Sequence, residues 1–247
     1  SDCSAMILNY ISNESIKYIH MKKLDDICFI VQARLNSQRV PQKMIKPFAG
    51  SSLFELIIDK LIWSDIIPKK NIYASVNEDE LKAIANKYKV NIYERSHESA
   101  NNDNSLQKIY EWHNKLPYKY CVLISGCNPL LSLRTIDSFV RNFVAQEEEN
   151  LFAVFEKKQY YWNKEGALVT PWPKGQTIMN TKAVEPTYEA AHVLYASRMD
   201  LIKDNKFMGD FQAEGGIKLF QMDELEAFDI DEPWQFEVAE VLYEKFK

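Results

Sequence analysis

The sequence predicts one α/β domain whose mainly parallel sheet is covered by helices on both faces. Strand-length apolar stretches alternate with helix-length amphipathic stretches through residues 27–155, and this order is typical of parallel strands joined by crossover helices. The chain has 247 residues, a length that suits one large domain. With 46% hydrophobic and 26% charged residues, it has the composition of a globular protein. We therefore expect a three-layer α/β/α architecture.

The first half of the chain supplies most of the expected sheet. The stretch 27–32 is continuously apolar, which indicates a strand that is buried on both faces. A helix is expected at 52–66, because Ser52 and Glu55 form a capping box ahead of apolar residues that recur on one helical face. Further strands are expected at 71–76, 90–94, 120–125 and 151–155, and further helices at 78–89, 104–115 and 132–148.

The alternation ends after residue 157. Aromatic residues and turn formers follow, so 157–197 is expected to be a small inserted β flap that serves dimerisation and the acceptor side of the site. Short strands are expected at 191–196, 217–220 and 227–230, and a closing helix at 232–247 with Pro233 in its first turn. Residues 1–26 are expected to be an N-terminal extension, of which the first 20 are dispensable, and 27–247 the domain.

Composition argues against several classes of protein. The seven glycines contain neither the Walker nor the Rossmann spacing, so a bound nucleotide would need another kind of phosphate loop. A net charge of −5 disfavours nucleic acid, and no apolar stretch has the length of a membrane helix. The four cysteines form no C-x-x-C pair, which favours buried free thiols in a reducing cytoplasm, and no secretory signal is recognisable at the N-terminus.

A basic loop follows the first expected strand. Arg34, Arg39, Lys43 and Lys46 lie between Asp26 and Glu55 with no acid among them. In open α/β sheets, ligands bind beyond the carboxyl ends of the strands, and guanidinium groups bind phosphate oxygens in bidentate fashion. The loop therefore predicts a phosphate site, the alternative being a solvated basic loop.

The same loop resembles the signature A-R-x-x-S-x-R-x-P-x-K of the sugar-acid cytidylyltransferases. That family includes acylneuraminate (CMP-sialic acid) synthetases, CMP-Kdo synthetases and spore-coat polysaccharide enzymes. The resemblance implies a fold like that of the nucleotide-diphospho-sugar transferases. It also implies magnesium-dependent transfer of CMP from CTP to a sugar, with release of pyrophosphate. The loop residues that it implies in nucleotide binding are Gln32, Ala33, Arg34, Ser37, Arg39 and Lys43, with Arg34 and Lys43 also catalytic.

Two aspartates near the C-terminus are the candidate metal ligands. On a strand Asp229 and Asp231 would point to the same side, and paired carboxylates suit Mg²⁺ or Mn²⁺. The alternative is an acidic cap on the last helix. The stretch is similar to the family's D-x-D-x-P ending, which implies metal binding and a catalytic role for Asp231 in deprotonating the acceptor hydroxyl through the metal. Gln235 stands where many relatives carry an acid.

The loop after the fourth expected strand, 124–130, is similar to two family patterns. Ser125 is expected to contact the nucleotide and Asn128 the substrate, the alternative being a plain loop with an Asn-Pro turn. Cys127 replaces an aspartate that binds metal in one of these patterns, and a thiol is a poor magnesium ligand. Leu131 replaces the arginine that closes the other pattern.

Two further segments complete the expected site. Arg95 lies in a segment similar to one that approaches the nucleotide in sialic-acid synthetases, although an ordinary polar turn is the alternative. Tyr188, Glu189 and His192 are candidates for the acceptor side, and relatives commonly have a glycine near His192. A structural histidine is the alternative at that position.

We conclude from the sequence that the chain is a cytoplasmic, homodimeric cytidylyltransferase. Its expected partners are CTP and an acidic or unusual sugar, with Mg²⁺ as cofactor and surface polysaccharide or glycoconjugate synthesis as its role; neither nucleic acid nor membrane is expected. A metal-dependent glycosyltransferase of GT-A-like fold and an inactive nucleotide-binding homologue are the alternatives. Release of pyrophosphate from CTP distinguishes the first function from the other two.

Overall fold

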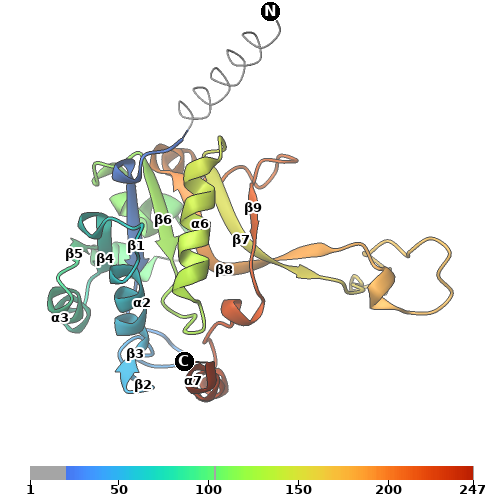
Figure 1. Ribbon diagram of the computed structural model, residues 1–247, viewed down its shortest axis with the longest axis horizontal. Coiled ribbons are helices and arrows are strands. Elements are labelled where there is room, and N and C mark those ends of the chain that lie inside the picture. Colours follow the sequence, from blue (N-terminus) through green and yellow to red (C-terminus); the bar gives the residue numbers. More distant parts are fainter. Residues whose placement is uncertain (1–20, 103, 247) are drawn as a thin grey trace, which may run out of the picture.

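The computed structural model describes residues 21–102 and 104–246. The expected dispensable segment, 1–20, lies outside the described residues. The central sheet has seven strands in the order β5-β4-β1-β6-β8-β7-β9 (Figure 1). Their bounds are β1 Ile27–Gln32, β4 Ile72–Val76, β5 Asn91–Glu94, β6 Tyr120–Ile124, β7 Asn150–Lys157, β8 Thr187–Arg198 and β9 Leu219–Gln221. A separate hairpin pairs β2 Pro47–Phe48 with β3 Ser51–Ser52.

Helices lie on both faces of this sheet. The α-helices are α2 Leu53–Ile62, α3 Asp79–Lys87, α4 His97–Asn101, α5 Leu106–Ile109, α6 Leu133–Ala145 and α7 Pro233–Phe246. The 3₁₀ helices are η1 Leu24–Asp26, η2 Lys69–Asn71, η3 Glu111–Asn114, η4 Thr181–Ala183, η5 Met199–Asp204 and η6 Leu225–Ala227. No helix of the described residues is long and apolar enough to cross a membrane.

Four strands form the parallel half of the sheet. β1 pairs in parallel with β4 and with β6, and β4 pairs in parallel with β5. β8 runs antiparallel between β6 and β7, whereas β9 is parallel to β7. The prediction of a mainly parallel sheet is confirmed. The antiparallel β8 arises because the chain leaves β7 through a long ribbon and returns beside it, without a crossover helix.

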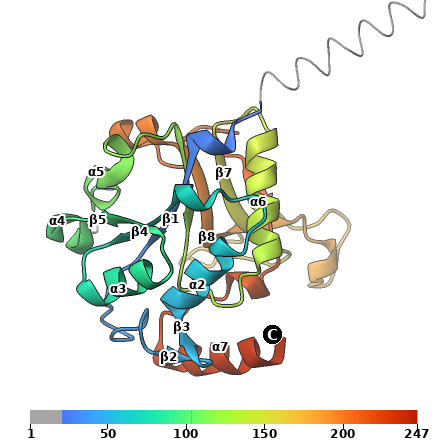
Figure 2. The same cartoon turned by 60° about the vertical axis from the view of Figure 1, so that its left-hand side comes forward.

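The two faces of β1 contribute to two different apolar clusters. Phe29 and Val31 pack with α2, α3, α6 and α7, whereas Cys28 and Ile30 pack with Trp112 of η3 and with η5. Figure 2 shows α2 and α6 over one face of the sheet. Burial on both sides explains why β1 has no polar residue before Gln32, as expected for a strand covered by helices on both faces.

Several expected elements differ from the structure. The helix expected at 52–66 ends at Ile62, since the Ser64 hydroxyl accepts hydrogen bonds from the amides of Ile66 and Ile67. The single helix expected at 104–115 is divided into α5 and η3 at Tyr110, whose φ of −108° and ψ of 44° are not helical. At this break the Tyr110 ring packs at 4.6 Å from that of Phe207.

The prediction of a strand at 227–230 is wrong. Residues up to Ala227 form η6, and the following residues pair with no strand. The Ile230 amide instead donates to the carbonyl of Cys127, which fixes the segment beside the end of β6. Alternation of side chains along a strand therefore does not determine where Asp229 and Asp231 point.

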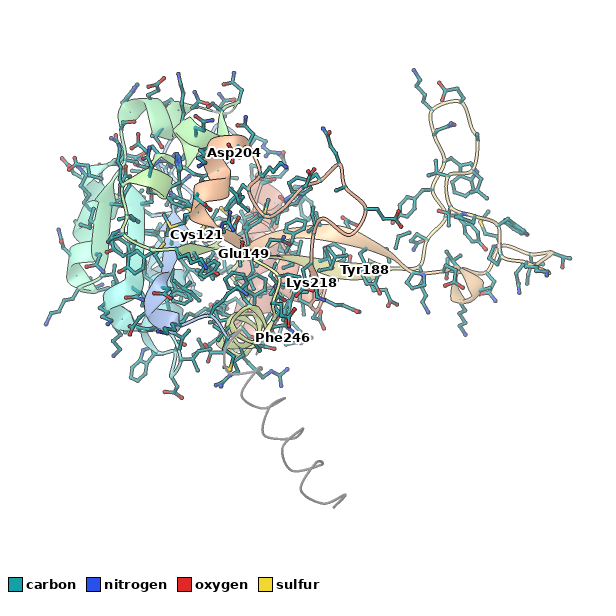
Figure 3. All side chains as sticks on the ribbon, turned by 90° about the horizontal axis from the view of Figure 1, so that it is seen from above. Cys121, Glu149, Tyr188, Asp204, Lys218 and Phe246 are labelled. Carbon is teal, nitrogen blue, oxygen red and sulfur yellow. The ribbon has the colours of Figure 1, made fainter. Side chains whose placement is uncertain are left out.

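A two-stranded ribbon of β7 and β8 leaves the sheet and carries residues 158–186 at its end (Figure 1). The register shifts from Phe152↔Tyr195 to Val154↔Ala190, so β8 contains a bulge between these pairs. The ribbon leaves the domain beyond this bulge, and Tyr188 lies on it (Figure 3). The expected insertion, 157–197, thus divides into this protruding segment and the strand β8, which is longer than the expected 191–196.

Candidate active site

The C-terminal ends of β1 and β6 border a cavity of about 770 Å³. Because parallel strands end at one edge of a sheet, the loops after these strands meet there. All eight expected nucleotide-binding residues line this cavity, together with one expected metal ligand and one expected acceptor residue. They are Gln32, Ala33, Arg34, Ser37, Arg39, Lys43, Arg95, Ser125, Asp231 and His192.

The basic loop after β1 contacts the acidic segment before α7 directly. Arg39 forms ion pairs with Asp231 and Glu232, both at 3.0 Å. The Lys43 ammonium donates to the carbonyl of Ile230 at 2.6 Å and lies 3.5 Å from the Asp231 carboxylate. The two strongest sequence motifs, at opposite ends of the chain, therefore form one site.

Asp229 lies beside this pair in a more buried setting. Burial raises the pKa of its carboxyl above the ordinary value, with the Asp231 charge as the next cause, while Lys43 acts in the opposite direction. Its Oδ1 atom is buried and has no hydrogen-bond partner. A buried carboxylate oxygen without a partner has an unmet need for a proton donor or a cation.

The two aspartates fit a magnesium ion whose other ligands are phosphate oxygens. No cluster of three or more His, Cys, Asp or Glu side chains able to hold a metal occurs in the described residues. Mg²⁺ does not require such a cluster, because it commonly binds one or two carboxylates together with substrate phosphates. The orphaned oxygen of Asp229 and the cavity-facing Asp231 meet this requirement.

Two of the expected nucleotide contacts are also structural. The Gln32 side chain accepts from the Ser75 hydroxyl and the Trp112 indole and donates to the Ile109 carbonyl. The guanidinium of Arg95 donates to the hydroxyl and the carbonyl of Ser99. Both side chains thus build the floor of the cavity, whatever they contribute to a nucleotide.

The charge of the cavity is concentrated beyond β1. Burial lowers the pKa of the Arg95 guanidinium, and the neighbouring positive charge of Arg34 lowers it further. Arg34 donates to the carbonyl of Ala100 at 3.1 Å, so it bridges the β1 loop and α4. Two neighbouring positive charges are stabilised by an anion that binds near both of them.

The loop after β6 forms another wall. The Ser125 hydroxyl accepts the Cys127 amide, and the Cys127 thiol lies 3.9 Å from the sulfur of Met44. Burial raises the pKa of this thiol, which therefore stays protonated. Cys127 accordingly contributes an apolar surface at the place where one of the two family patterns has an aspartate.

The three other expected substrate contacts lie outside the lining of this cavity. Asn128 is 2% exposed, and its amide donates to the Ala227 carbonyl. Tyr188 and Glu189 pair with Glu156 and Phe155 along the protruding ribbon. Asn128 thus ties two loops together, and contact of Tyr188 and Glu189 with an acceptor stays a prediction.

His192 is the expected acceptor residue that does line the cavity. It lies in the bulge of β8 with a φ of 53°, in the left-handed region that favours glycine. Its ring faces Phe152 at 6.3 Å. The bulge therefore turns the imidazole toward the cavity at a cost in backbone strain.

Several lining residues were not predicted from the sequence. Tyr195 follows His192 on the inner part of β8, and its ring stacks on Phe152 at 5.6 Å. Asn36 reaches across the cavity and donates to Asn101 at 2.7 Å. Asn101 begins the polar stretch 101–105, which the functional interpretation of the Arg95 segment places against the cytidine or the sugar, whereas Tyr195 belongs to a strand whose partners could not be derived locally.

A larger cavity, about 1080 Å³, lies between α6, β9 and α7. None of the expected site residues lines it. Its charged side chains are mixed in sign, with Lys60 and Arg134 facing Asp223 and Glu226. The cavity at the end of β1 is therefore the candidate active site, although it is the smaller one.

Comparisons with known proteins agree with this location. A family model described as Cytidylyltransferase matches residues 28–246. No curated protein matches the sequence. A solved CMP:2-keto-3-deoxy-manno-octonic acid synthetase in complex with CTP is 11% identical, with a TM-score of 0.65 over 90% of this chain and 100% of the other. A 4-diphosphocytidyl-2C-methyl-D-erythritol synthase from Anaerococcus prevotii is 15% identical, with a TM-score of 0.64 over 88% and 96%.

At these identities the structural likeness concerns the fold. It confirms the predicted architecture of the nucleotide-diphospho-sugar transferase type. The family match extends over both sequence motifs and over the sheet that joins them.

Proposed function

The chain belongs to the cytidylyltransferase family, and from this premise we propose that it activates an acidic or unusual sugar by transfer of CMP from CTP. The sugar hydroxyl attacks the α-phosphate in line, and pyrophosphate leaves. The product would serve the synthesis of a surface polysaccharide or glycoconjugate.

One observation carries this proposal. Lys43 and Arg39 of the basic loop meet Asp231 at the edge of a single cavity, next to a second carboxylate with an unpartnered oxygen. A nucleoside triphosphate and a divalent cation need opposite charges side by side. Here the chain holds both kinds of group within one ion-pair network.

The cationic side chains would bind and orient the triphosphate. Arg34, Arg39 and Lys43 lie around the cavity, and Ser37 adds a hydroxyl to the same wall. Groups placed in advance where negative charge develops lower the barrier without rearranging during the reaction. Arg39 is exposed, and its ion pair with Asp231 is exposed too. Because exposed ion pairs contribute little free energy, Arg39 can turn toward a phosphate at little cost.

Asp229 and Asp231 would hold magnesium together with phosphate oxygens. The ion would supply neutralisation of charge on the phosphates as the leaving group departs. Within the chain, Asp231 lines the same cavity as His192, the expected acceptor residue. It is therefore the residue that we assign to deprotonation of the acceptor hydroxyl.

The acceptor would enter along β8. His192 and Tyr195 of β8 line the cavity, and the ribbon that carries Tyr188 and Glu189 is formed by the preceding part of the same strand. We assign the protruding segment 158–186 to contact with a second copy of the chain. This assignment is supported by its exposed apolar side chains Tyr161, Trp162, Val169, Trp172, Ile178 and Met179.

A pyrophosphate-release screen tests the function. CTP, UTP, GTP and ATP are each combined with a panel of sugar acids and Mg²⁺, and release is expected with CTP and one acceptor. Hydrolysis or transfer from a CMP-sugar without pyrophosphate release from CTP would favour a glycosyltransferase. CTP binding without turnover across the panel would favour the inactive homologue.

Two variants test the assigned residues in the same assay. Arg34→Ala and Asp231→Ala should each lower the rate by on the order of 10² to 10³ while the fold persists. Arg134→Ala is the matched control, because this exposed arginine on α6 lies outside the candidate active site. Full activity in either test variant contradicts the role given to that residue.

A further inference from the structure

Gln235 occupies the first turn of α7, directly after the two candidate metal ligands. Its side-chain oxygen accepts hydrogen bonds from the backbone amides of Asp231, at 2.7 Å, and Glu232, at 2.6 Å. These amides precede Pro233, the first residue of the helix. Gln235 thus supplies the half of a capping box that reaches back from the third helical position.

The other half of that capping box is missing, and this has a consequence for the acids. Carboxylates at a helix start normally accept the free amides of the first turn. Here the Glu232 side chain pairs with Arg39 instead, and Asp231 faces Lys43 and Arg39. Because Gln235 fixes the backbone amides of both residues, the start of α7 is ordered without a cap from these carboxylates, which are directed to Arg39 and Lys43.

We propose that Gln235 is a positioning residue that keeps the Asp231 carboxylate available for a divalent cation. The inference rests on the proposed function, since it assumes that Asp231 binds the metal. It also gives a physical account of the amide at a position where many relatives have an acid. The amide oxygen accepts from both backbone amides as the oxygen of an acid would, so the bonds that fix the backbone of Asp231 are preserved at this position.

The surrounding contacts support one rigid unit. The Ile230 amide donates to Cys127, and the Ile230 carbonyl accepts from Lys43 at 2.6 Å. With the Gln235 bonds on the following two residues, the backbone from residue 230 to 232 is held at three consecutive positions. Contacts that fix the residues carrying metal ligands orient those ligands, and their loss typically lowers metal affinity by about 10- to 100-fold.

Equilibrium binding of CTP tests the proposal without turnover. Isothermal titration in the absence of acceptor gives the CTP affinity with and without Mg²⁺, and the ratio of the two affinities is the magnesium-dependent gain. Gln235→Leu removes the accepting oxygen and should lower this gain by about tenfold. Its magnesium-free affinity for CTP should stay unchanged, because the basic loop is intact. Gln235→Glu keeps an accepting oxygen and should retain the gain.

Ser132→Ala is the matched control for loss of a helix cap. Ser132 caps α6 by accepting the Thr135 amide at 3.1 Å, and it lies outside the candidate active site. This variant should lower the melting temperature as Gln235→Leu does, while the magnesium-dependent gain is unaltered. Should Gln235→Leu fail to fold, Gln235→Asn, whose amide is one methylene shorter, takes its place.

The outcomes separate this inference from the function on which it rests. A normal gain in wild type and in Gln235→Leu overturns the positioning role and leaves the proposed function intact. An equal loss in Ser132→Ala also overturns it, because the effect would then follow stability alone. Absence of any CTP binding in the wild-type chain overturns both.

Discussion

Substitution of Lys43 should affect two separately measurable quantities, the free energy of unfolding and the rate of pyrophosphate release. Its side chain is 13% exposed and holds the Ile230 carbonyl at 2.6 Å and the Asp231 carboxylate at 3.5 Å. Lys43→Met keeps an unbranched side chain, one atom shorter, and removes the charge. A hydrogen bond to a charged group contributes about 1.5–3 kcal/mol, so the free energy of unfolding should fall by about that amount.

This loss corresponds to a decrease in melting temperature of about 3 to 12 °C for a chain of this size. The rate of pyrophosphate release, measured well below that temperature, should fall further, by on the order of 10² to 10³. The two effects are independent, since the first reflects the bond to Ile230 and the second the absent charge beside the triphosphate. Denaturant unfolding and a pyrophosphate-release assay at saturating CTP measure them.

Lys46→Met is the matched control in the same basic loop. The Lys46 ammonium lies 4.4 Å from the centre of the Phe236 ring and is not part of the cavity lining. Its removal should cost about 0.5–1 kcal/mol and leave the rate unchanged. If Lys43→Met retains the wild-type rate, or if Lys46→Met loses as much, the assignment of Lys43 to the triphosphate is refuted.

Three further predictions concern other parts of the fold. His192→Gly should raise the free energy of unfolding by up to about 1 kcal/mol, because glycine relieves the strain of a φ of 53°, and it should raise KM for the acceptor. Lys89→Gly, at a φ of 57° outside the cavity, is the control and should give the stability gain alone. An unchanged KM in His192→Gly would count against contact of His192 with the acceptor. Burial lowers the pKa of Lys60 to about 8. Between pH 8 and about 10.4 the unfolded chain therefore binds one more proton than the folded chain, and the free energy of unfolding should rise with pH across that window by about 3 kcal/mol. Lys60→Met should flatten this rise in unfolding titrations, and an unchanged slope would contradict the lowered pKa of Lys60. Replacing Trp162 and Met179 together by serine should shift sedimentation from dimer to monomer while CTP affinity is retained, and an unaltered dimer would exclude the protruding segment as the contact.

The elements predicted best are those whose signal is local. β1 and α2 follow from the apolar stretch at 27–32 and from the Ser52 cap, whose hydroxyl accepts the Glu55 amide as the capping box requires. The helix expected at 104–115 fails because Tyr110 takes a non-helical backbone to pack on Phe207, a residue far along the chain. Propensity describes neighbours in sequence and is overridden where distant packing contributes more free energy.

The candidate site likewise has parts that were predictable from the sequence and parts that were not. The basic loop and the Asp-x-Asp pair were recognisable in the sequence, since each motif is contiguous. The sequence did not exclude an acidic cap on the last helix. The structure places Gln235, and not the acids, on the backbone amides of Asp231 and Glu232, which leaves the two carboxylates to Arg39 and Lys43.

The sequence by itself determined the class of fold and the family, because alternating periodicity and a contiguous loop motif are both encoded over short distances. Only the tertiary structure decided that Asn128 ties two loops together while His192 faces the cavity. It also decided that Lys43 meets Asp231, although 188 positions separate them. Such contacts depend on the order of strands in the sheet and on a bulge in β8, and both are set by the packing of the whole domain.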